Sequence, residues 1–175
     1  MRESTSNCRL RRVLPMVAAL LALLPACKPA ESGGPVFQGA RAYADLKQIV
    51  AFGPREPGSP ASLAAREFIR KEVEAAGLEL QEFPFVAQAP QGPVNMVNLV
   101  AEVKGTEPGI ILLTNHYDTK VFRDFAFDGA NDGGSTAAWM IEMARALGPA
   151  RQGRSVWLCW FDGELWVLCR QHRVV

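Results

Sequence analysis

The spacing of apolar residues predicts two amphipathic helices in the first half of the chain. Apolar positions three and four residues apart indicate a helix over residues 37–52. Its inward face is expected to comprise Tyr43, Leu46, Ile49 and Val50. A Gly- and Pro-rich loop at 53–60 follows, and its last two residues, Ser59 and Pro60, are typical of a helix N-cap and first turn. The second helix is predicted to run to about Ala76. Its buried stripe is expected to comprise Leu63, Phe68, Ile69 and Val73.

A change of period after Gly77 predicts strands. Residues 78–85 alternate, and Pro84 favours a place at the edge of a sheet. A loop over 87–93 leads to a second alternating run at 96–104. Residues 110–113 are apolar without alternation, as expected for a central strand covered on both faces.

The last two predicted elements complete an α/β pattern. Residues 133–147 have helical spacing, and residues 155–161 form an apolar strand. The core side of this helix is expected to comprise Ala137, Met140, Ile141, Ala144 and Leu147. Two helices, three strands, a helix and a strand predict an α/β fold with a mixed open sheet flanked by helices.

The first 27 residues have the pattern of an export leader. Basic residues end at Arg12, an apolar run covers 13–26, and the run is too short to span a bilayer comfortably. It ends in Leu-Pro-Ala-Cys, which resembles a bacterial lipobox with Cys27 as the lipidated residue. Plain signal cleavage, an uncleaved anchor and a buried core helix are the alternatives. The leader therefore predicts an exported protein, in the bacterial periplasm or tethered to a membrane by lipid or signal anchor.

Composition indicates a soluble protein body and little else. The chain has 175 residues, a net charge of +1 and 21% charged residues, a balance that argues against a nucleic-acid partner. The polar segment 28–36 reads as a linker. Of the remaining cysteines, Cys159 is expected in the core, whereas Cys8 and Cys169 lie in the leader and the tail, and no pair has metal-binding spacing.

Polar residues that can do chemistry gather where predicted strands end. His116 and Asp118 follow one strand, Asp162 and Glu164 follow another, and Asp132 precedes a helix. Ligands bind at the carboxyl ends of strands in open α/β sheets, and His and Asp are zinc ligands. We expect a metal site in which Asp118 orients the His116 ring. Each residue alone also fits a simpler role: a surface turn for His116 and Asp118, a helix cap for Asp132.

The motifs HYDTK (116–120), GAND (129–132) and FDGE (161–164), in this order, resemble the zinc-dependent peptidase family M28. Within that family they are most similar to glutaminyl-peptide cyclotransferases. The segment 53–60, Met96, Asn98 and the helix sequence IEMARAL share in the resemblance.

The resemblance implies roles for three residues. In such cyclases Asp132 would hold the zinc, Glu164 would carry the proton, and the substrate would be a peptide or protein N-terminus bearing glutamine. In two-zinc aminopeptidases His116 and Asp132 would be ligands and Glu164 would activate water. The open alternatives are therefore a cyclase, an M28 metallo-aminopeptidase, and an inactive membrane-tethered fragment.

The sequence departs from the family pattern after Glu164. Leu165 stands where the cyclase motif has a second Glu, and residues 165–175 match no family motif, with His172 a weak substitute ligand. The expected organisation is a leader (1–27), a linker (28–36), the N-terminal part of a catalytic domain (37–164) and an aberrant tail (165–175) from a frameshift or premature stop. We expect weak zinc binding and impaired activity.

Overall fold

The computed structural model describes residues 36–163, apart from 90, 91 and 123. All of them belong to the second of two compact units, residues 34–175. Their order is α2 (Gly39–Ala51), α3 (Pro60–Ala75), β1 (Leu80–Ala89), β2 (Gly92–Val103), β3 (Glu107–His116), η1 (Ala130–Ser135), α4 (Thr136–Leu147) and β4 (Arg154–Phe161). Among these described helices, none is both long and apolar enough to cross a membrane.

The four strands form one mixed sheet in the order β1-β2-β4-β3. The pairs β1–β2 and β2–β4 are antiparallel, whereas β3 and β4 are parallel and joined through α4. Parallel neighbours require such a crossover, because a tight turn cannot return the chain to the same end of the sheet. The predicted α/β class, with a mixed open sheet and flanking helices, is confirmed.

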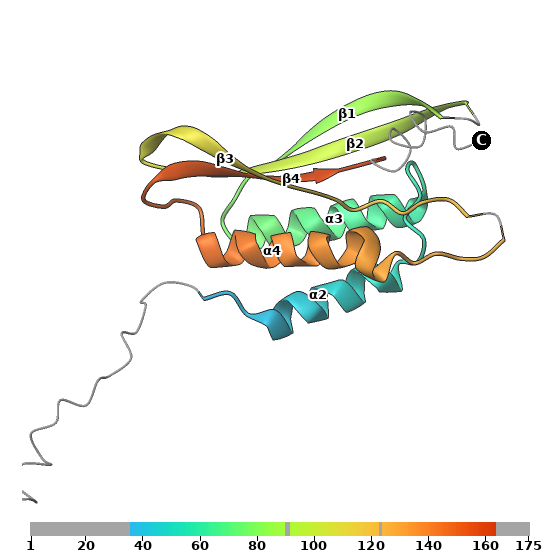
Figure 1. Ribbon diagram of the computed structural model, residues 1–175, viewed down its shortest axis with the longest axis horizontal. Coiled ribbons are helices and arrows are strands. Elements are labelled where there is room, and N and C mark those ends of the chain that lie inside the picture. Colours follow the sequence, from blue (N-terminus) through green and yellow to red (C-terminus); the bar gives the residue numbers. More distant parts are fainter. Residues whose placement is uncertain (1–35, 90–91, 123, 164–175) are drawn as a thin grey trace, which may run out of the picture. The chain divides into compact units, whose positions relative to one another are not determined.

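The helices lie on one side of this sheet (Figure 1). Helices α3 and α4 pack against the sheet, and α2 packs on α4. The core between them is apolar, and its largest buried side chain, Trp160, donates its indole N–H to the carbonyl of Ala137 at 3.2 Å. Cys159 is a buried free thiol, as predicted. The predicted inward face of α4 is also confirmed, with four of its residues fully buried and Leu147 packed on the core.

The first two helices begin and end close to prediction, and their predicted inward faces are confirmed in part, since Ile49, Ile69 and Val73 are fully buried. Ser59 caps α3 by accepting from the Ser62 N–H at 3.1 Å, as predicted. Tyr43 and Leu63, however, are exposed at 61% and 49%, so their assignment to the core was wrong. Helix α3 lies on the sheet through the small residues Ser62 and Ala65 together with Ile69 and Val73. Small side chains allow close approach, which apolar spacing alone does not reveal.

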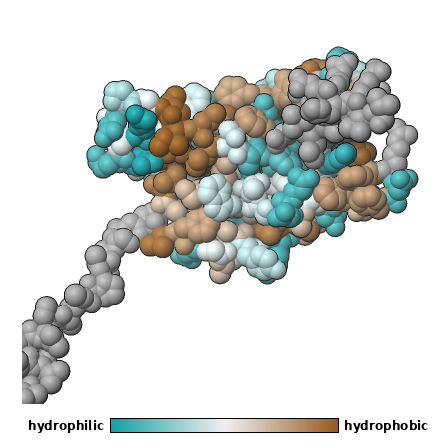
Figure 2. All heavy atoms as spheres, viewed as in Figure 1, coloured by the Kyte–Doolittle hydropathy of each residue, from teal (hydrophilic) through white to brown (hydrophobic). Residues whose placement is uncertain are grey.

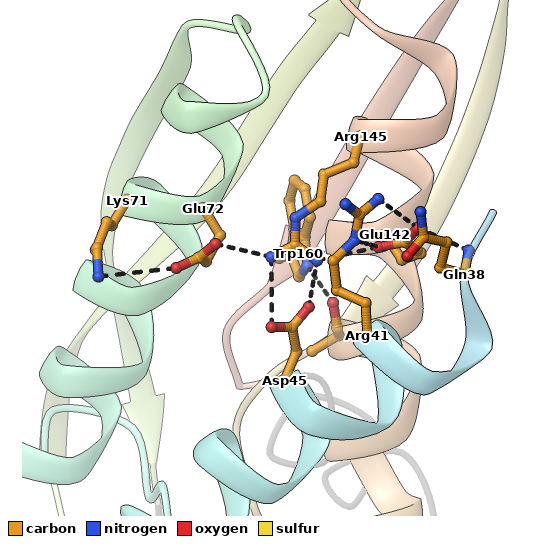
Figure 3. Close-up of polar contacts among 9 residues, drawn as sticks. Gln38, Arg41, Asp45, Lys71, Glu72, Glu142, Arg145 and Trp160 are labelled. Carbon is orange, nitrogen blue, oxygen red and sulfur yellow. Dashed lines mark hydrogen bonds and ion pairs between the residues drawn. The ribbon is translucent and has the colours of Figure 1, made fainter. Parts of the chain in front are cut away.

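Helix α2 is held by charge as well as by apolar contact (Figure 3). The carboxylate of Glu142, fully buried on α4, accepts from Arg41 at 2.6 and 2.8 Å and from the Gln38 backbone N–H at 2.8 Å. Arg145, one turn further along α4, pairs with Asp45 of α2 and Glu72 of α3. These five charged side chains form what we call the helix cluster: Arg41, Asp45, Glu72, Glu142 and Arg145. Because a buried charge is costly without a partner, the cluster defines which faces of the three helices meet.

The predicted bounds of the first two strands need correction. Strands β1 and β2 extend into the expected loop at 87–93 and pair in register from Leu80–Ala101 to Ala89–Gly92. The edge position of the first strand is confirmed, because β1 is outermost in the sheet.

The expectation that residues 110–113 form a central strand covered on both faces was wrong for the described sheet. Strand β3 is its other edge, and Ile110, Ile111 and Leu112 are 52%, 40% and 56% exposed. Figure 2 shows hydrophobic surface along this edge. The described helices cover one face of the sheet, so β3 side chains that point to the other face are open to solvent.

Candidate functional site

The parallel strands β3 and β4 bring the predicted residues to one edge of the sheet. His116 is paired with Phe161, the last residue of β4, and the Tyr117 N–H donates to the Phe161 carbonyl at 3.1 Å. The segments that follow both strands therefore start side by side. Asp118 and Asp162 lie immediately beyond them, as the strand-end pattern predicted.

His116 lies between two carboxylates. Its Nδ1 is 3.2 Å from Asp118 Oδ1, and its Nε2 is 3.1 Å from Asp132 Oδ1. The Asp118 side chain is fully buried, the His116 side chain is 13% exposed and that of Asp132 is 46% exposed. Asp118 thus lies behind the ring, where it favours one tautomer and orientation, and Asp132 lies on the solvent side.

A π-helical turn presents Asp132 to the histidine. Element η1 begins after Gly129, which has φ of +54°, and Asp132 within it has non-helical angles of −87° and +101°. Helix α4 starts only at Thr136, three residues later than predicted, and its N-cap Ser135 makes no side-chain cap bond. The reading of Asp132 as a helix cap was therefore wrong, and its carboxylate contacts His116 instead.

Gly133 allows the histidine ring to approach this turn. Its φ is +83°, and a Cβ there would lie 2.9 Å from His116 Cε1 and 2.8 Å from the Asp118 carbonyl oxygen. Any other residue would therefore combine backbone strain with a clash against the candidate ligand. The sequence showed glycine here but not the ring that packs on it.

Asp162 is buried at the end of β4 and joins it to β2. Its Oδ2 accepts from the Val97 N–H at 3.0 Å, and its own N–H donates to Asn98 Oδ1 at 3.0 Å. Its Oδ1 is buried without a hydrogen-bond partner in the described part of the chain. Burial raises the pKa of Asp162 to about 6; the nearby Asp118 adds to the rise and the Val97 N–H opposes it. The pair 162–163 leads directly to Glu164.

Arg55 is a residue of the site that sequence reasoning missed. It comes from the Gly- and Pro-rich loop at 53–60, is fully buried, and donates to the Tyr117 carbonyl at 2.9 Å and the Gly129 carbonyl at 3.1 Å. Burial lowers the pKa of Arg55, while Asp118, Asp128 and Asp132 oppose the shift. Only the resemblance of this loop to family M28 marked the segment, and nothing in its polarity indicated a buried side chain.

The donors at this edge suit a zinc ion. Two ligands on a tetrahedral zinc, with bonds of about 2.0–2.1 Å, lie about 3.3 Å apart, close to the 3.1 Å between His116 Nε2 and Asp132 Oδ1. The same distance also fits a hydrogen bond between these two atoms. The match to zinc therefore rests on the partly exposed Asp132 oxygen and on the combination of a nitrogen and an oxygen ligand. Among the described residues, no group of three or more His, Cys, Asp or Glu side chains could hold a metal.

Several predicted residues lie outside the described part of the chain. They are Cys27, Glu164, Cys169 and His172. Their predicted roles in lipidation, proton transfer and metal binding stay predictions.

Residues 98–168 match Peptidase family M28. The chain is similar to this family over that segment. It is 34% identical over 135 residues to a glutaminyl-peptide cyclotransferase of Bos taurus, an alignment that covers 69% of this chain and 37% of the relative. The chain therefore spans little more than a third of that relative's length.

Solved structures of M28-like enzymes share the fold. A glutaminyl cyclase from an Acidobacteriales bacterium superposes with a TM-score of 0.67 at 39% identity, covering 78% of this chain and 48% of that one. A Zn-dependent exopeptidase from Parabacteroides distasonis gives a TM-score of 0.65 at 28% identity, covering 74% and 48%. The predicted resemblance to family M28 and to its cyclases is confirmed.

Proposed function

We propose that this chain carries part of a glutaminyl cyclase site, which converts an N-terminal glutamine to pyroglutamate with release of ammonia. One structural observation carries the proposal: His116, braced by Asp118, faces Asp132 at 3.1 Å where β3 and β4 end. The cyclases of Bos taurus and the Acidobacteriales bacterium are 34% and 39% identical to this chain.

The reaction needs proton transfer and charge stabilisation. The α-amine nitrogen attacks the γ-carbonyl carbon of glutamine, the new ring bond forms, and the carbon–nitrogen bond to the departing amide nitrogen breaks. The proton lost by the amine leaves with ammonia, so no water is consumed. Glu164 is proposed to carry this proton, because a carboxylate can act as base and then as acid.

Asp132 would hold a zinc ion, and the ion would polarise the γ-carbonyl when bound. The buried Asp118 would keep His116 in one orientation beside it. The two hydrogen bonds that Asp162 makes with Val97 and Asn98 of β2 would restrain the backbone that precedes Glu164. The contributions of Asp118, Asp162 and Asn98 are ones of positioning, which lowers the entropic cost of ring closure.

The test is mass spectrometry of a Gln-initiated peptide incubated with the purified chain and zinc. An N-acetylated peptide, which lacks the attacking amine, is the substrate control. Because the sequence predicts an incomplete ligand set, a chimera joining residues up to Glu164 to the C-terminal half of the Acidobacteriales cyclase is tested in parallel. Pyroglutamate formation that is lost with Asp132→Asn supports the proposal. A folded, zinc-loaded chimera that forms none overturns it.

A second candidate is a metallo-exopeptidase. The observation that favours it is the distance of 3.1 Å between His116 Nε2 and Asp132 Oδ1, because both residues would be ligands in a two-zinc aminopeptidase. The Zn-dependent exopeptidase of Parabacteroides distasonis has a related fold. Release of the chromophore from an aminoacyl amide, with no pyroglutamate formed, would favour this function.

Export and anchoring are proposed from the leader alone. Cys27 would carry the lipid that tethers the domain to a membrane. Labelling of expressing bacteria with a fatty-acid analogue, compared between the parent chain and Cys27→Ser, tests this: label on the parent alone supports it, and equal label contradicts it.

A further inference from the structure

The guanidinium of Arg55 connects three segments of the candidate site. It donates to the carbonyl oxygens of Gly53 at 3.1 Å, Tyr117 at 2.9 Å, Asp128 at 2.7 Å and Gly129 at 3.1 Å. The backbone of Arg55 is also bonded to the site, because its carbonyl accepts from the Thr119 N–H at 3.0 Å. The side chain is fully buried.

The acceptors are the backbone of the residues next to the site. Tyr117 lies between His116 and Asp118 in sequence, so the bond to its carbonyl restrains both. Gly129 begins the η1 turn, and its carbonyl also accepts from the Gly134 N–H at 3.0 Å. Arg55 thus holds the two ends of the loop 118–129 and, through them, the backbone that carries His116 and Asp132.

The packing around Gly129 shows how closely these parts fit. A Cβ on Gly129 would lie 3.2 Å from Arg55 Nη2 and 2.6 Å from both the Thr119 Cγ2 and the Asp132 carbonyl oxygen. The guanidinium, the loop and the π-helical turn therefore leave no room for a side chain at position 129. A shorter or differently shaped side chain at position 55 would leave the turn without its support.

Charge supports the same conclusion. Asp118, Asp128 and Asp132 each stabilise the cationic form of Arg55. The hydrogen bonds of its guanidinium, however, go to carbonyl oxygens, which leaves the carboxylates of Asp118 and Asp132 for His116. A neutral residue would remove the positive charge that these three carboxylates share.

We propose that Arg55 is a positioning residue that holds His116 and Asp132 at the spacing the site requires. The need for this spacing rests on the proposed function. It touches neither side chain of this pair through its own hydrogen bonds and acts through the backbone.

The experiment reads the His116 ring directly. The chain has two histidines, so the full chain with His172→Ala shows His116 alone. Long-range proton–nitrogen NMR of the labelled imidazole reports which ring nitrogen carries the proton and whether each is hydrogen-bonded. We expect two distinct nitrogen signals in the parent chain. In Arg55→Gln they should move toward the averaged values of a freely exchanging ring, several-fold further than in any control. Arg55→Lys, which keeps the charge, should restore part of the difference.

Two control variants separate positioning from stability. Arg70→Gln removes an arginine that pairs with Glu82 away from the site, and Ile69→Val loosens the core. Both should leave the His116 signals unchanged, even where the melting temperature falls as far as in Arg55→Gln.

Folded Arg55→Gln with parental His116 signals overturns the proposal. Failure of both Arg55 variants to fold also overturns it, because Arg55 would then serve the whole fold. The readout needs neither zinc nor turnover, so failure of the cyclase assay leaves this result intact.

Discussion

Two groups of charged residues, at different places in the fold, satisfy their charges in opposite ways. In the helix cluster every carboxylate is paired with an arginine, and Glu142 accepts hydrogen bonds from Arg41, Arg145 and a backbone N–H. The strand-end cluster comprises Arg55, His116, Asp118, Asp132 and Asp162. There the arginine donates to backbone carbonyls, and one oxygen each of Asp118 and Asp162 is buried without a partner among the described residues.

The pKa shifts show the same difference. Burial, the largest effect on Glu142, raises its pKa, but hydrogen bonds from Arg41, the Gln38 N–H and Arg145 together bring it below the ordinary value. For Asp162 the hydrogen bond from the Val97 N–H does not offset burial, and with a smaller contribution from the nearby Asp118 its pKa is raised to about 6. Fully paired charges serve structure, whereas buried carboxylates left partly unpaired mark a place where binding or proton transfer can supply the missing partner.

Glu142→Ala should produce the largest loss of stability. It removes the acceptor of four hydrogen bonds and leaves Arg41 and the Gln38 N–H without that partner. We expect the free energy of unfolding to fall by about 3 kcal/mol, measured by urea denaturation. Glu74→Ala is the control, because Glu74 is half-exposed and pairs with Arg70 alone among the described residues, and it should cost less than about 1 kcal/mol. Equal losses would show that burial of the cluster contributes nothing.

Asp162→Asn should remove a pH dependence of stability. The carboxyl titrates near 3.8 when unfolded and at about 6 when folded, so between these values the folded state binds the extra proton. The contribution of Asp162 to stability should therefore be greatest below about pH 4 and fall by on the order of 2–3 kcal/mol as pH rises through about 6. The asparagine can still accept from the Val97 N–H and does not titrate.

Urea denaturation of the parent chain and Asp162→Asn over this pH range tests the prediction. Glu142 provides the contrast: its lowered pKa contributes stability that is present above its unfolded value and lost as pH falls through the folded one. An unchanged pH profile in Asp162→Asn would show that the strand-end carboxylate is not strained by burial.

Gly133→Ala should disturb the strand-end cluster through sterics. The added Cβ would meet His116 and the Asp118 carbonyl below 3.0 Å at a φ of +83°, and we expect a loss of about 2 kcal/mol. Gly77→Ala is matched in φ at +85°, but its Cβ would meet only Pro149 at 3.8 Å, so about 1 kcal/mol is expected. The His116 NMR signals should move in Gly133→Ala alone. Equal losses with unmoved signals would contradict the close packing.

Asp132→Asn should have the smallest effect on stability and a clear effect on metal binding. Its side chain is 46% exposed and contacts His116 at one oxygen, so unfolding free energy should change by less than about 0.5 kcal/mol. Zinc affinity, measured by titration with a competing indicator, should fall by about tenfold or more, because a carboxylate ligand is replaced by a neutral amide. Zinc binding equal to that of the parent would exclude Asp132 as a ligand.

Local patterns predicted the elements well and their surroundings less well. The stripe on α4 was predicted correctly because its buried residues are apolar and regularly spaced. The face of α2 was predicted only in part: Ile49 is buried, but so is Asp45, which pairs with Arg145, a residue 100 positions away. Apolar character likewise indicated burial for β3, yet which strands lie beside it is a property of the whole sheet.

The sequence by itself determined the order of helices and strands, the cap at Ser59, the resemblance to family M28 and the presence of His116, Asp118 and Asp132 near strand and helix ends. Those features depend on residues close together along the chain. Only the tertiary structure decided that Asp132 faces His116 rather than capping α4 and that Gly133 makes room for the ring. It also decided that a buried Arg55 joins the loop at 53–60 to the two ends of the loop 118–129. The physical reason is that hydrogen bonds and close contacts between distant segments depend on where the backbone turns in space, which local periodicity does not encode.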